Sequence, residues 1–132
     1  METPTWRANP DWGTRLGYEA ADLDRINRDA VAFLREFGRE FKDVELIVSG
    51  NIGPRGDGYD PGELLSPAVA ADYHRPQIDS FANAGADRIT MLTATHTGKS
   101  IGVVQSATAA QVPVVIAFTV ETDGRLPSGQ PL

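Results

Sequence analysis

Three short apolar runs alternate with three helical patterns along this chain, and that alternation constrains the fold more than any other feature of the sequence. The last run, PVVIAFTV, is almost continuously apolar, as parallel strands buried on both faces are. Strands that alternate with helices predict right-handed crossovers and a parallel sheet. The expected fold class is therefore α/β, built from parallel βα units. The expected strands span residues 44–49, 88–93 and 113–120, and the expected helices span residues 20–40, 67–84 and 97–110.

Capping signals and apolar spacing define the expected helices. Ser66 can cap the second helix with Pro67 at its first position, and Gly85 follows its end. Pro76 lies inside this helix and is expected to kink or shorten it. Residues 1–18 contain prolines, glycines and two tryptophans and are expected to be irregular. The apolar stripe expected on the first helix consists of Leu23, Ile26, Ala30, Leu34, Phe37 and Phe41.

The composition limits the classes of function that remain open. The chain of 132 residues suits one domain, and its formal net charge of −6 argues against nucleic acid or an anionic membrane as partner. No apolar run approaches the roughly 18 residues that span a bilayer, and no signal peptide is evident, so a cytoplasmic location is expected. There is no cysteine to act as nucleophile or metal ligand. The histidines are His74, expected to be exposed on a helix, and His96, expected in a loop.

Each expected strand is followed by a polar loop rich in glycine, serine or threonine. The carboxyl ends of parallel strands meet at one edge of the sheet, where α/β proteins bind ligands, so these loops are expected to form a site. Thr93 and Thr95 alternate on the second strand, which directs both hydroxyls to one side. His96 is either a surface residue of the second loop or a contact to the ligand. The loops read SGNIGPRGDGY, TATHTGKS and TVETDGRLPSG.

Two local motifs have alternative interpretations. TGKS, at residues 97–100, is placed like a phosphate-binding loop, but the full pattern needs a glycine where Thr93 stands. A plain helix start is the simpler interpretation, and nucleotide binding is the weaker hypothesis. In DGYDPGE, Asp57, Asp60 and Glu63 lack the alternate spacing of a calcium loop, which favours a solvated acidic turn.

Four motifs in order, TPTWRANPDW, SGNIGPRGDGY, AGADRITMLTAT and VVIAFTVETDGRLPSG, resemble the homocysteine S-methyltransferase family. The resemblance implies a (β/α)8 TIM barrel that transfers a methyl group to the sulfur of homocysteine, forming methionine. It places residues 1–132 as one partial domain, about half a barrel, from the end of barrel strand two through strand five. Residues 1–18 would be the irregular loop after strand two. The family's zinc ion is held by three cysteines at the ends of strands six and eight. The resemblance therefore implies zinc in the full-length domain and none bound by this chain itself.

The resemblance also implies a substrate-binding wall without catalytic residues or metal ligands in this chain. The residue before Thr93 is commonly glutamate in the family, suited to the ammonium group of the substrate, and here it is Leu92. The methyl donor is not indicated by the sequence. The substrate-binding residues expected from the resemblance are Trp6, Asn51, Gly53, Pro54, Thr93, Thr95, His96, Thr119 and Asp123.

Two hypotheses of different classes follow from the sequence. The first is a piece of a zinc-dependent thiol S-methyltransferase of methionine biosynthesis, acting on homocysteine and a methyl donor and not competent by itself. The alternative is a non-catalytic half barrel that binds a small molecule or a partner. In either case half a barrel leaves open sheet edges, which could pair with another copy or a complementing chain.

Overall fold

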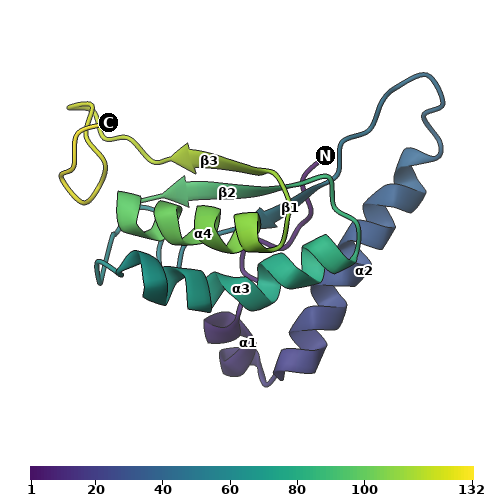
Figure 1. Ribbon diagram of the computed structural model, residues 1–132, viewed down its shortest axis with the longest axis horizontal. Helices are drawn as coiled ribbons and strands as arrows, with labels where there is room; N and C mark the ends of the chain where they lie inside the picture. The colour runs from purple at the N-terminus through teal and green to yellow at the C-terminus, as the bar shows by residue number, and fades with distance from the viewer.

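The computed structural model describes all residues from 1 to 132 and shows a parallel three-stranded sheet with helices packed against it (Figure 1). The strand order is the chain order, so each strand pairs with the next through a helical crossover. The elements are α1 (Pro10–Leu16), α2 (Ala20–Gly38), β1 (Ser49–Ile52), α3 (Pro67–Asn83), β2 (Arg88–Ala94), α4 (Thr97–Ala109) and β3 (Val114–Phe118).

The N-terminal residues add a fourth extended segment to the sheet, next to β1. Glu2 pairs with Ser49 in a parallel bridge, and the Thr3 amide donates to the Ser49 carbonyl oxygen over 2.9 Å. Further along, the Gly53 amide donates to the Trp6 carbonyl oxygen over 3.1 Å. Residues 1–6 and β3 therefore lie at the two edges of this sheet, with β1 and β2 between them.

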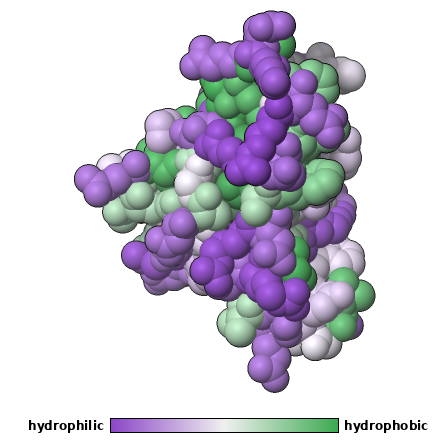
Figure 2. All heavy atoms as spheres, turned by 90° about the vertical axis from the view of Figure 1, so that its right-hand side faces the viewer, coloured by the Kyte–Doolittle hydropathy of each residue, from purple (hydrophilic) through white to green (hydrophobic).

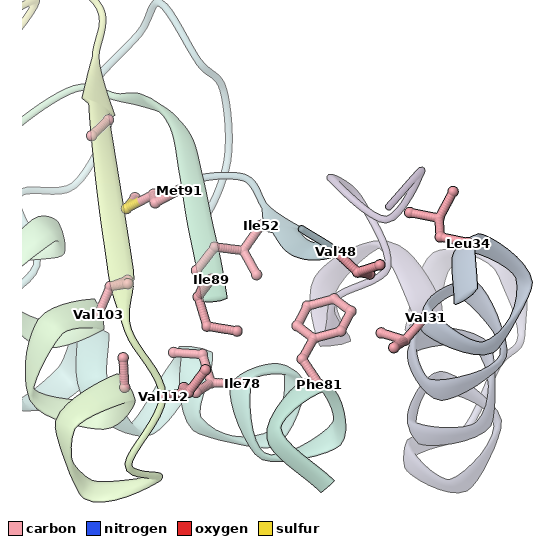
Figure 3. Packing of buried hydrophobic residues seen from close by; sticks show 12 residues of the cluster. Val31, Leu34, Val48, Ile52, Ile78, Phe81, Ile89, Met91, Val103 and Val112 are labelled. Atoms are coloured by element: carbon pink, nitrogen blue, oxygen red, sulfur yellow. The ribbon is translucent and has the colours of Figure 1, made fainter. Parts of the chain in front are cut away.

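The hydrophobic core lies between the sheet and the helices (Figures 1 and 3). Ile52 and Ile89 extend from the strands toward Ile78 and Phe81 on α3. Gly50 makes this packing possible, because a Cβ at that position would lie 2.5 Å from the Phe81 ring. The helices thus cover one face of the sheet with apolar contacts.

The opposite face of the sheet, here called the open face, carries polar side chains joined to one another. The hydroxyls of Ser49 and Thr90 lie 2.6 Å apart, and Thr90 Oγ1 also donates to Glu2 Oε1 over 3.2 Å. Arg88 forms a 3.6 Å ion pair with the same carboxylate. No helix covers this face, and its polar side chains instead bond to one another, although Arg88 Nε is left without a partner.

The N-termini of α3 and α4 are capped in different ways. Only the cap of α3 is the one that the sequence predicts. Ser66 Oγ accepts from the Val69 amide at the start of α3, as its capping position predicts. The α4 cap residue, His96, makes no side-chain cap hydrogen bond. Gln130, from the C-terminal tail, instead accepts from the Thr97 amide over 3.0 Å. The tail is thereby joined to the start of α4.

Two expected elements are placed differently in the structure. The strand expected at residues 44–49 begins only at Ser49 and ends at Ile52, because β1 pairs with β2 from the Ser49–Arg88 position onward. Val44 and Ile47, although β-branched, precede that pairing and are exposed. Residues 1–18 are not wholly irregular, since Asn9 caps the short helix α1 with Pro10 at its first position.

The helices also depart from expectation in two details. α3 continues through Pro76 to Asn83, one residue before the expected end, so the proline does not shorten it appreciably. Pro76 lies on the exposed side of the helix, where the missing amide costs least, because water can satisfy the freed carbonyl. On α2 the buried residues are Asn27, Val31 and Leu34, whereas Phe37 and Phe41 of the expected stripe are exposed. None of the helices is long and apolar enough to span a membrane.

Candidate functional site

The segment Gly53–Gly62, here called the glycine loop, leaves the end of β1 and packs against Trp6. A Cβ at Gly53 would lie 2.6 Å from Cε2 of the Trp6 indole and 2.7 Å from its carbonyl oxygen. Only glycine therefore permits this approach of the loop to the end of the N-terminal strand. The neighbouring Pro54 is buried. The structure thus brings Trp6, Gly53 and Pro54 together, as the predicted site requires.

Gly58, at the middle of the glycine loop, contacts the ends of β2 and β3. Thr119 Oγ1, just after β3, donates to the Gly58 carbonyl oxygen over 2.8 Å. A Cβ at Gly58 would lie 2.9 Å from Thr93 Oγ1 and 3.4 Å from the Trp6 ring. Four of the predicted residues, Trp6, Gly53, Thr93 and Thr119, therefore line one region where the glycine loop meets the carboxyl ends of the strands.

Thr93 has a left-handed backbone, with φ of 57°, which is a strained conformation for a β-branched residue. The pairing of β2 with β3 shifts register between Met91 and Ala94, as in a β-bulge. Thr93 Oγ1 donates to the Leu92 carbonyl oxygen over 2.7 Å. Bulges re-aim side chains near functional sites, and strained residues concentrate there. The geometry marks the end of β2 as the most distorted part of the sheet.

Three predicted residues are buried and retain polar atoms without a hydrogen-bond partner in the protein. These atoms are Asn51 Oδ1, Thr95 Oγ1 and His96 Nε2. Burial, with a smaller contribution from the positive charge of Lys99, lowers the pKa of His96 and favours its neutral imidazole. The C-terminal tail helps to bury this strand end, since the Ser128 amide donates to the Thr95 carbonyl oxygen. His96 is thus not the surface residue that one interpretation of the sequence indicated.

Asp123 is exposed and belongs to a turn of the C-terminal tail. Its Oδ1 accepts from the Arg125 amide over 3.0 Å, which matches the local turn that the sequence indicates. No hydrogen bond or ion pair joins the Asp123 side chain to the glycine loop or to the other predicted site residues. The structure therefore separates Asp123 from the group that it brings together.

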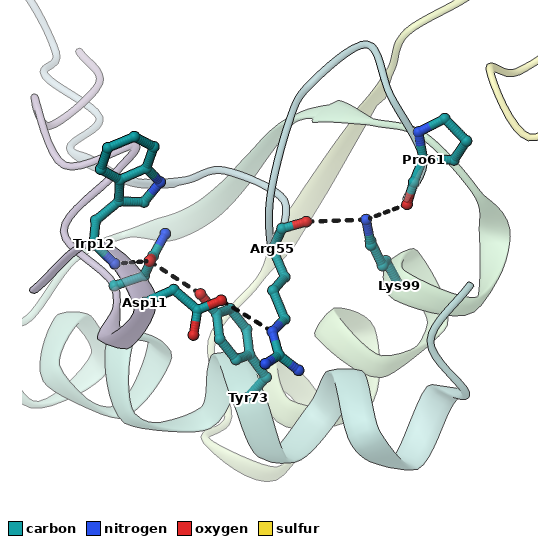
Figure 4. A network of polar contacts seen from close by, with 7 residues as sticks. Asp11, Trp12, Arg55, Pro61, Tyr73 and Lys99 are labelled. Carbon is teal, nitrogen blue, oxygen red and sulfur yellow. Dashed lines mark hydrogen bonds and ion pairs between the residues drawn. The ribbon is translucent and has the colours of Figure 1, made fainter. Parts of the chain in front are cut away.

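The outer side of the glycine loop is anchored by a polar network that the sequence analysis did not identify (Figure 4). Arg55 Nε donates to Asp11 on α1 over 3.0 Å, and its guanidinium lies 5.0 Å from the centre of the Tyr73 ring. The Tyr73 hydroxyl donates in turn to Asn9 Oδ1 over 3.0 Å. Lys99 Nζ donates to two carbonyl oxygens of the loop, as Figure 4 shows. Asp11, Arg55 and Lys99 border a cavity of about 340 Å³ between the loop, α1 and α4.

His74 is buried, and the expectation that it would be exposed is wrong. Its exposed fraction is 1%, and neither ring nitrogen has a partner in the protein. Burial lowers the pKa of His74 to about 4, and the charges of Lys99 and Arg55 act in the same direction. α4 packs closely on this stretch of α3, because Gly102 has no Cβ to meet Ala71. The pair Gly98 and Gly102, four residues apart, was the available sequence signal for this close contact.

The largest cavity lies elsewhere, on the helical side of the sheet. It has a volume of about 660 Å³ and is formed by α1, α2 and α3. Leu23, Asn27, Pro76 and Gln77 are among its lining residues, and none of the predicted site residues contributes to it. It is a groove between helices, remote from the strand ends where α/β proteins carry their chemistry.

Comparison with known protein families identifies the family of this chain. The family model described as homocysteine S-methyltransferase matches residues 1–132, the whole chain. The chain belongs to the homocysteine S-methyltransferase family. The family resemblance inferred from the four sequence motifs is thereby confirmed. A search of curated proteins found no significant match.

Solved structures of a homocysteine methyltransferase show the same fold. The metallated and the oxidised forms of MmuM from Escherichia coli each superpose with a TM-score of 0.88 at 22% sequence identity. Each match covers 98% of this chain and 49% of the solved chain. The apo form gives a TM-score of 0.77 at 21% identity, covering 98% and 47%. This chain therefore spans about half the length of these proteins, and the predicted α/β fold of parallel βα units forming about half a barrel is confirmed.

The residues present do not fit the zinc site that the family resemblance implies. The chain has no cysteine, and no group of three or more His, Cys, Asp or Glu side chains could hold a metal ion. Structural and catalytic zinc sites need at least three such ligands at bonding distance.

Proposed function

We propose that this chain forms one wall of the homocysteine pocket in a methyltransferase that converts homocysteine to methionine. The observation that carries the proposal is the meeting of the glycine loop with the carboxyl ends of three neighbouring strand segments. Trp6, Thr93 and Thr119 come from different segments and surround Gly53 and Gly58. Ligands of parallel α/β folds bind at this end of the strands.

The proposed role of these residues is to bind and orient the substrate. Glycines let the backbone amides approach a small amino acid closely, while the Trp6 indole supplies an apolar surface for its carbon chain. Asn51 Oδ1 and Thr95 Oγ1, buried without partners, are available to hydrogen-bond a polar substrate group. Activation of the thiol, which a zinc ion supplies when it is bound, would depend on cysteine ligands outside this chain.

The proposal can be tested without metal by titrating L-methionine, the product, into the ¹⁵N-labelled chain. Saturable shifts of the Gly53, Gly58 and Thr93 amide resonances are expected, with no change for residues in the middle of α2. L-Serine serves as the control, since it shares the amino-acid group but lacks the thioether chain. Absence of any shift with millimolar methionine would count against a substrate wall formed by this chain.

Catalysis needs a separate measurement on the protein from its native source. Its intact mass, zinc content and formation of methionine from homocysteine with S-methylmethionine or S-adenosylmethionine should be measured together. A species of about 250 residues or more, the size of a full barrel, with bound zinc and activity would support the methyltransferase proposal. A zinc-free, inactive species of 14.2 kDa would contradict catalysis by this protein alone.

Exposed apolar surface specifically favours the alternative, a half barrel that binds a partner. Phe33 and Phe37 stack on α2, and Phe41, just beyond its end, packs tilted against Phe37; their exposed fractions range from 40% to 63%. Val115 on β3 and Ile101 on α4 are also more than 40% exposed. Figure 2 shows such apolar surface among hydrophilic residues on the side that lies at the right of Figure 1.

The exposed groups indicate what such a partner would supply. Residues 1–6 and β3 each have one unpaired side, so a partner must offer a parallel strand to both edges. The four strand segments of this chain are joined by three major helices, α2, α3 and α4. If two copies paired edge to edge, no helix would cover the two places where the copies meet. A complementing chain that begins and ends with helices would fit better than a second copy. Analytical ultracentrifugation of the isolated chain at micromolar concentration distinguishes a complementing chain from a second copy. A dimer of 28 kDa, twice 14.2 kDa, would favour self-association.

A further inference from the structure

Lys99 is one of only two lysines in the chain, and it is almost completely buried. Its exposed fraction is 1%, whereas Lys42 is exposed. Lysines are rarely fully buried unless their charge is compensated. None of the ion pairs in the protein includes Lys99. The compensation must therefore come from other polar groups.

Those groups are two backbone carbonyl oxygens on opposite arms of the glycine loop. Lys99 Nζ donates to the Arg55 carbonyl oxygen over 3.1 Å and to the Pro61 carbonyl oxygen over 3.2 Å (Figure 4). The two acceptors are six residues apart, and Gly56 and Gly58 lie between them. Both contacts are charge-assisted, which makes them stronger than hydrogen bonds between neutral groups.

The position of Lys99 is unfavourable for any role in stabilising its own helix. It lies in the first turn of α4, where the helix dipole disfavours a positive charge. Burial lowers the pKa of Lys99, with Asp60 opposing and Arg55 reinforcing that effect. Gly98 allows α4 to begin so close to the loop, since a Cβ there would lie 2.5 Å from the Leu65 carbonyl oxygen. Placing a lysine here is unfavourable for the helix, and Gly98 is needed to bring it close to the loop. We infer that the function of Lys99 is its contact with the loop.

The TGKS motif acquires a physical explanation from these contacts. In a phosphate-binding loop, the backbone amides at the helix start and the lysine would both be available to an anion. Here Gln130 accepts from the Thr97 amide, and Lys99 is engaged by the glycine loop. The motif's polar groups are used within the protein.

We propose that Lys99 is a positioning residue that closes the two arms of the glycine loop and holds Gly58 against Thr93 and Thr119. The consequence for substrate binding rests on the proposed function, whereas the closure of the loop does not. Lys99 fixes the loop from the side of α4, and Thr119 fixes it from the side of β3. Loss of the lysine contacts would free both arms at once.

Hydrogen exchange of the glycine loop tests the closure directly. In Lys99→Met, which keeps the length and removes the charge, exchange of the Tyr59 and Asp60 amides, which both donate to Asp57 Oδ1 within the loop, should rise about tenfold or more. Exchange in β2 and α2 should change much less. Lys42→Met is the matched control and should exchange like the wild type, while Lys99→Arg, which keeps charge and donors, should retain most of the protection. Equal loop exchange in Lys99→Met and the wild type would overturn the proposal.

Reductive methylation of the wild-type protein gives a test that needs no variant to fold. Lys42 should be methylated rapidly and Lys99 at least about a hundredfold more slowly, because its amine is inaccessible in the closed loop. Similar rates at the two lysines would overturn the closure.

Methionine titration separates closure of the loop from its effect on the pocket. If the loop is the substrate wall, Lys99→Met should weaken methionine binding about tenfold or more, with Lys42→Met unchanged. If Lys99→Met exchanges faster in the loop but binds methionine as tightly as the wild type, Lys99 closes the loop but does not position the substrate pocket. A wild-type protein that binds no methionine would contradict the proposed function, and the exchange result would still decide the closure.

Discussion

Thr119 Oγ1 lies 2.8 Å from the carbonyl oxygen of Gly58 and donates a hydrogen bond to it. The contact spans 61 residues of sequence and joins the end of β3 to the middle of the glycine loop. A side chain at a strand end thereby positions the loop that follows a different strand. Glycine loops have little side-chain packing of their own, so such long-range contacts decide their conformation.

Replacing Thr119 with valine should destabilise the protein by about 1 kcal/mol, because the Gly58 carbonyl would lose its partner with little change in side-chain volume. Urea denaturation followed by circular dichroism would measure the change. Thr108→Val, at an exposed position on α4, is the matched control and should stay within about 0.5 kcal/mol of the wild type. A Thr119→Val variant as stable as this control would show that the hydrogen bond contributes nothing measurable.

Gly53→Ala should displace Trp6, because the new Cβ would lie 2.6 Å from the indole and 2.7 Å from the rigid backbone oxygen. The expected cost is about 1–3 kcal/mol, as for other overpacked sites. In a Trp12→Phe background, Trp6 is the only tryptophan, so its fluorescence emission reports the displacement directly.

Gly17→Ala is a suitable comparison for that change. Gly17 has φ of 79° and no neighbouring atom within 4 Å of an added Cβ. It should cost about 1 kcal/mol through backbone strain alone, with no change in Trp6 emission. Identical emission from both variants would mean that Gly53 is not required for the approach of the loop to Trp6.

The order and type of the main elements could be predicted because local signals and the fold agree. Ser66 and Pro67 begin α3 as their capping chemistry predicts, and the strand at Arg88–Ala94 extends only one residue beyond expectation. β1 could not be placed correctly, since Gly50 and Asn51 have little intrinsic preference for strands. Their pairing with β2 fixes them as a strand, and pairing is a property of the tertiary structure.

The candidate site was only partly predictable for a related reason. Polar loops after strands indicated where a site would form, but the lysine that closes the glycine loop lies in α4, 44 residues away from Arg55. Asp123 looked similar to the other loop residues, yet its carboxylate serves its own turn. Burial of His74 depends on the close approach of α3 and α4, which apolar periodicity alone does not reveal.

Stability should fall as the pH drops from about 6.5 to about 4, because His74 is buried as the neutral imidazole. Burial lowers its folded-state pKa from the ordinary value of 6.5 to about 4, so in this range only the unfolded state takes up the proton. The stabilisation is therefore fully present above pH 6.5 and is lost as the pH falls toward 4. The difference corresponds to about 3 kcal/mol between those limits.

Urea denaturation at pH 7.5, 5.5 and 4.5 would measure this dependence. His74→Phe, which cannot titrate, should make the profile between pH 6.5 and 4.5 clearly less steep, even if the variant is less stable overall. Burial also lowers the pKa of His96, so the slope that remains in His74→Phe is expected to come from His96. Asp87, whose pKa is lowered by its hydrogen bond from Arg35, contributes only below its ordinary value of 3.8. An unchanged slope in His74→Phe would assign the pH dependence to other groups.

Gln111→Gly should stabilise the protein by about 1 kcal/mol, because Gln111 ends α4 with φ of 56°, a conformation that glycine adopts without strain. The Val112 amide donates to the Ala107 carbonyl oxygen and the Gln111 amide to that of Thr108, so the backbone of this helix end is already fixed. Ala110→Gly tests the reasoning from the opposite side, since Ala110 has a helical φ of −80° and gains nothing from glycine. That variant should lose about 0.5–1 kcal/mol. The melting temperature should therefore rise in Gln111→Gly and fall in Ala110→Gly. Shifts of the same sign in both variants would refute the assignment of strain to Gln111.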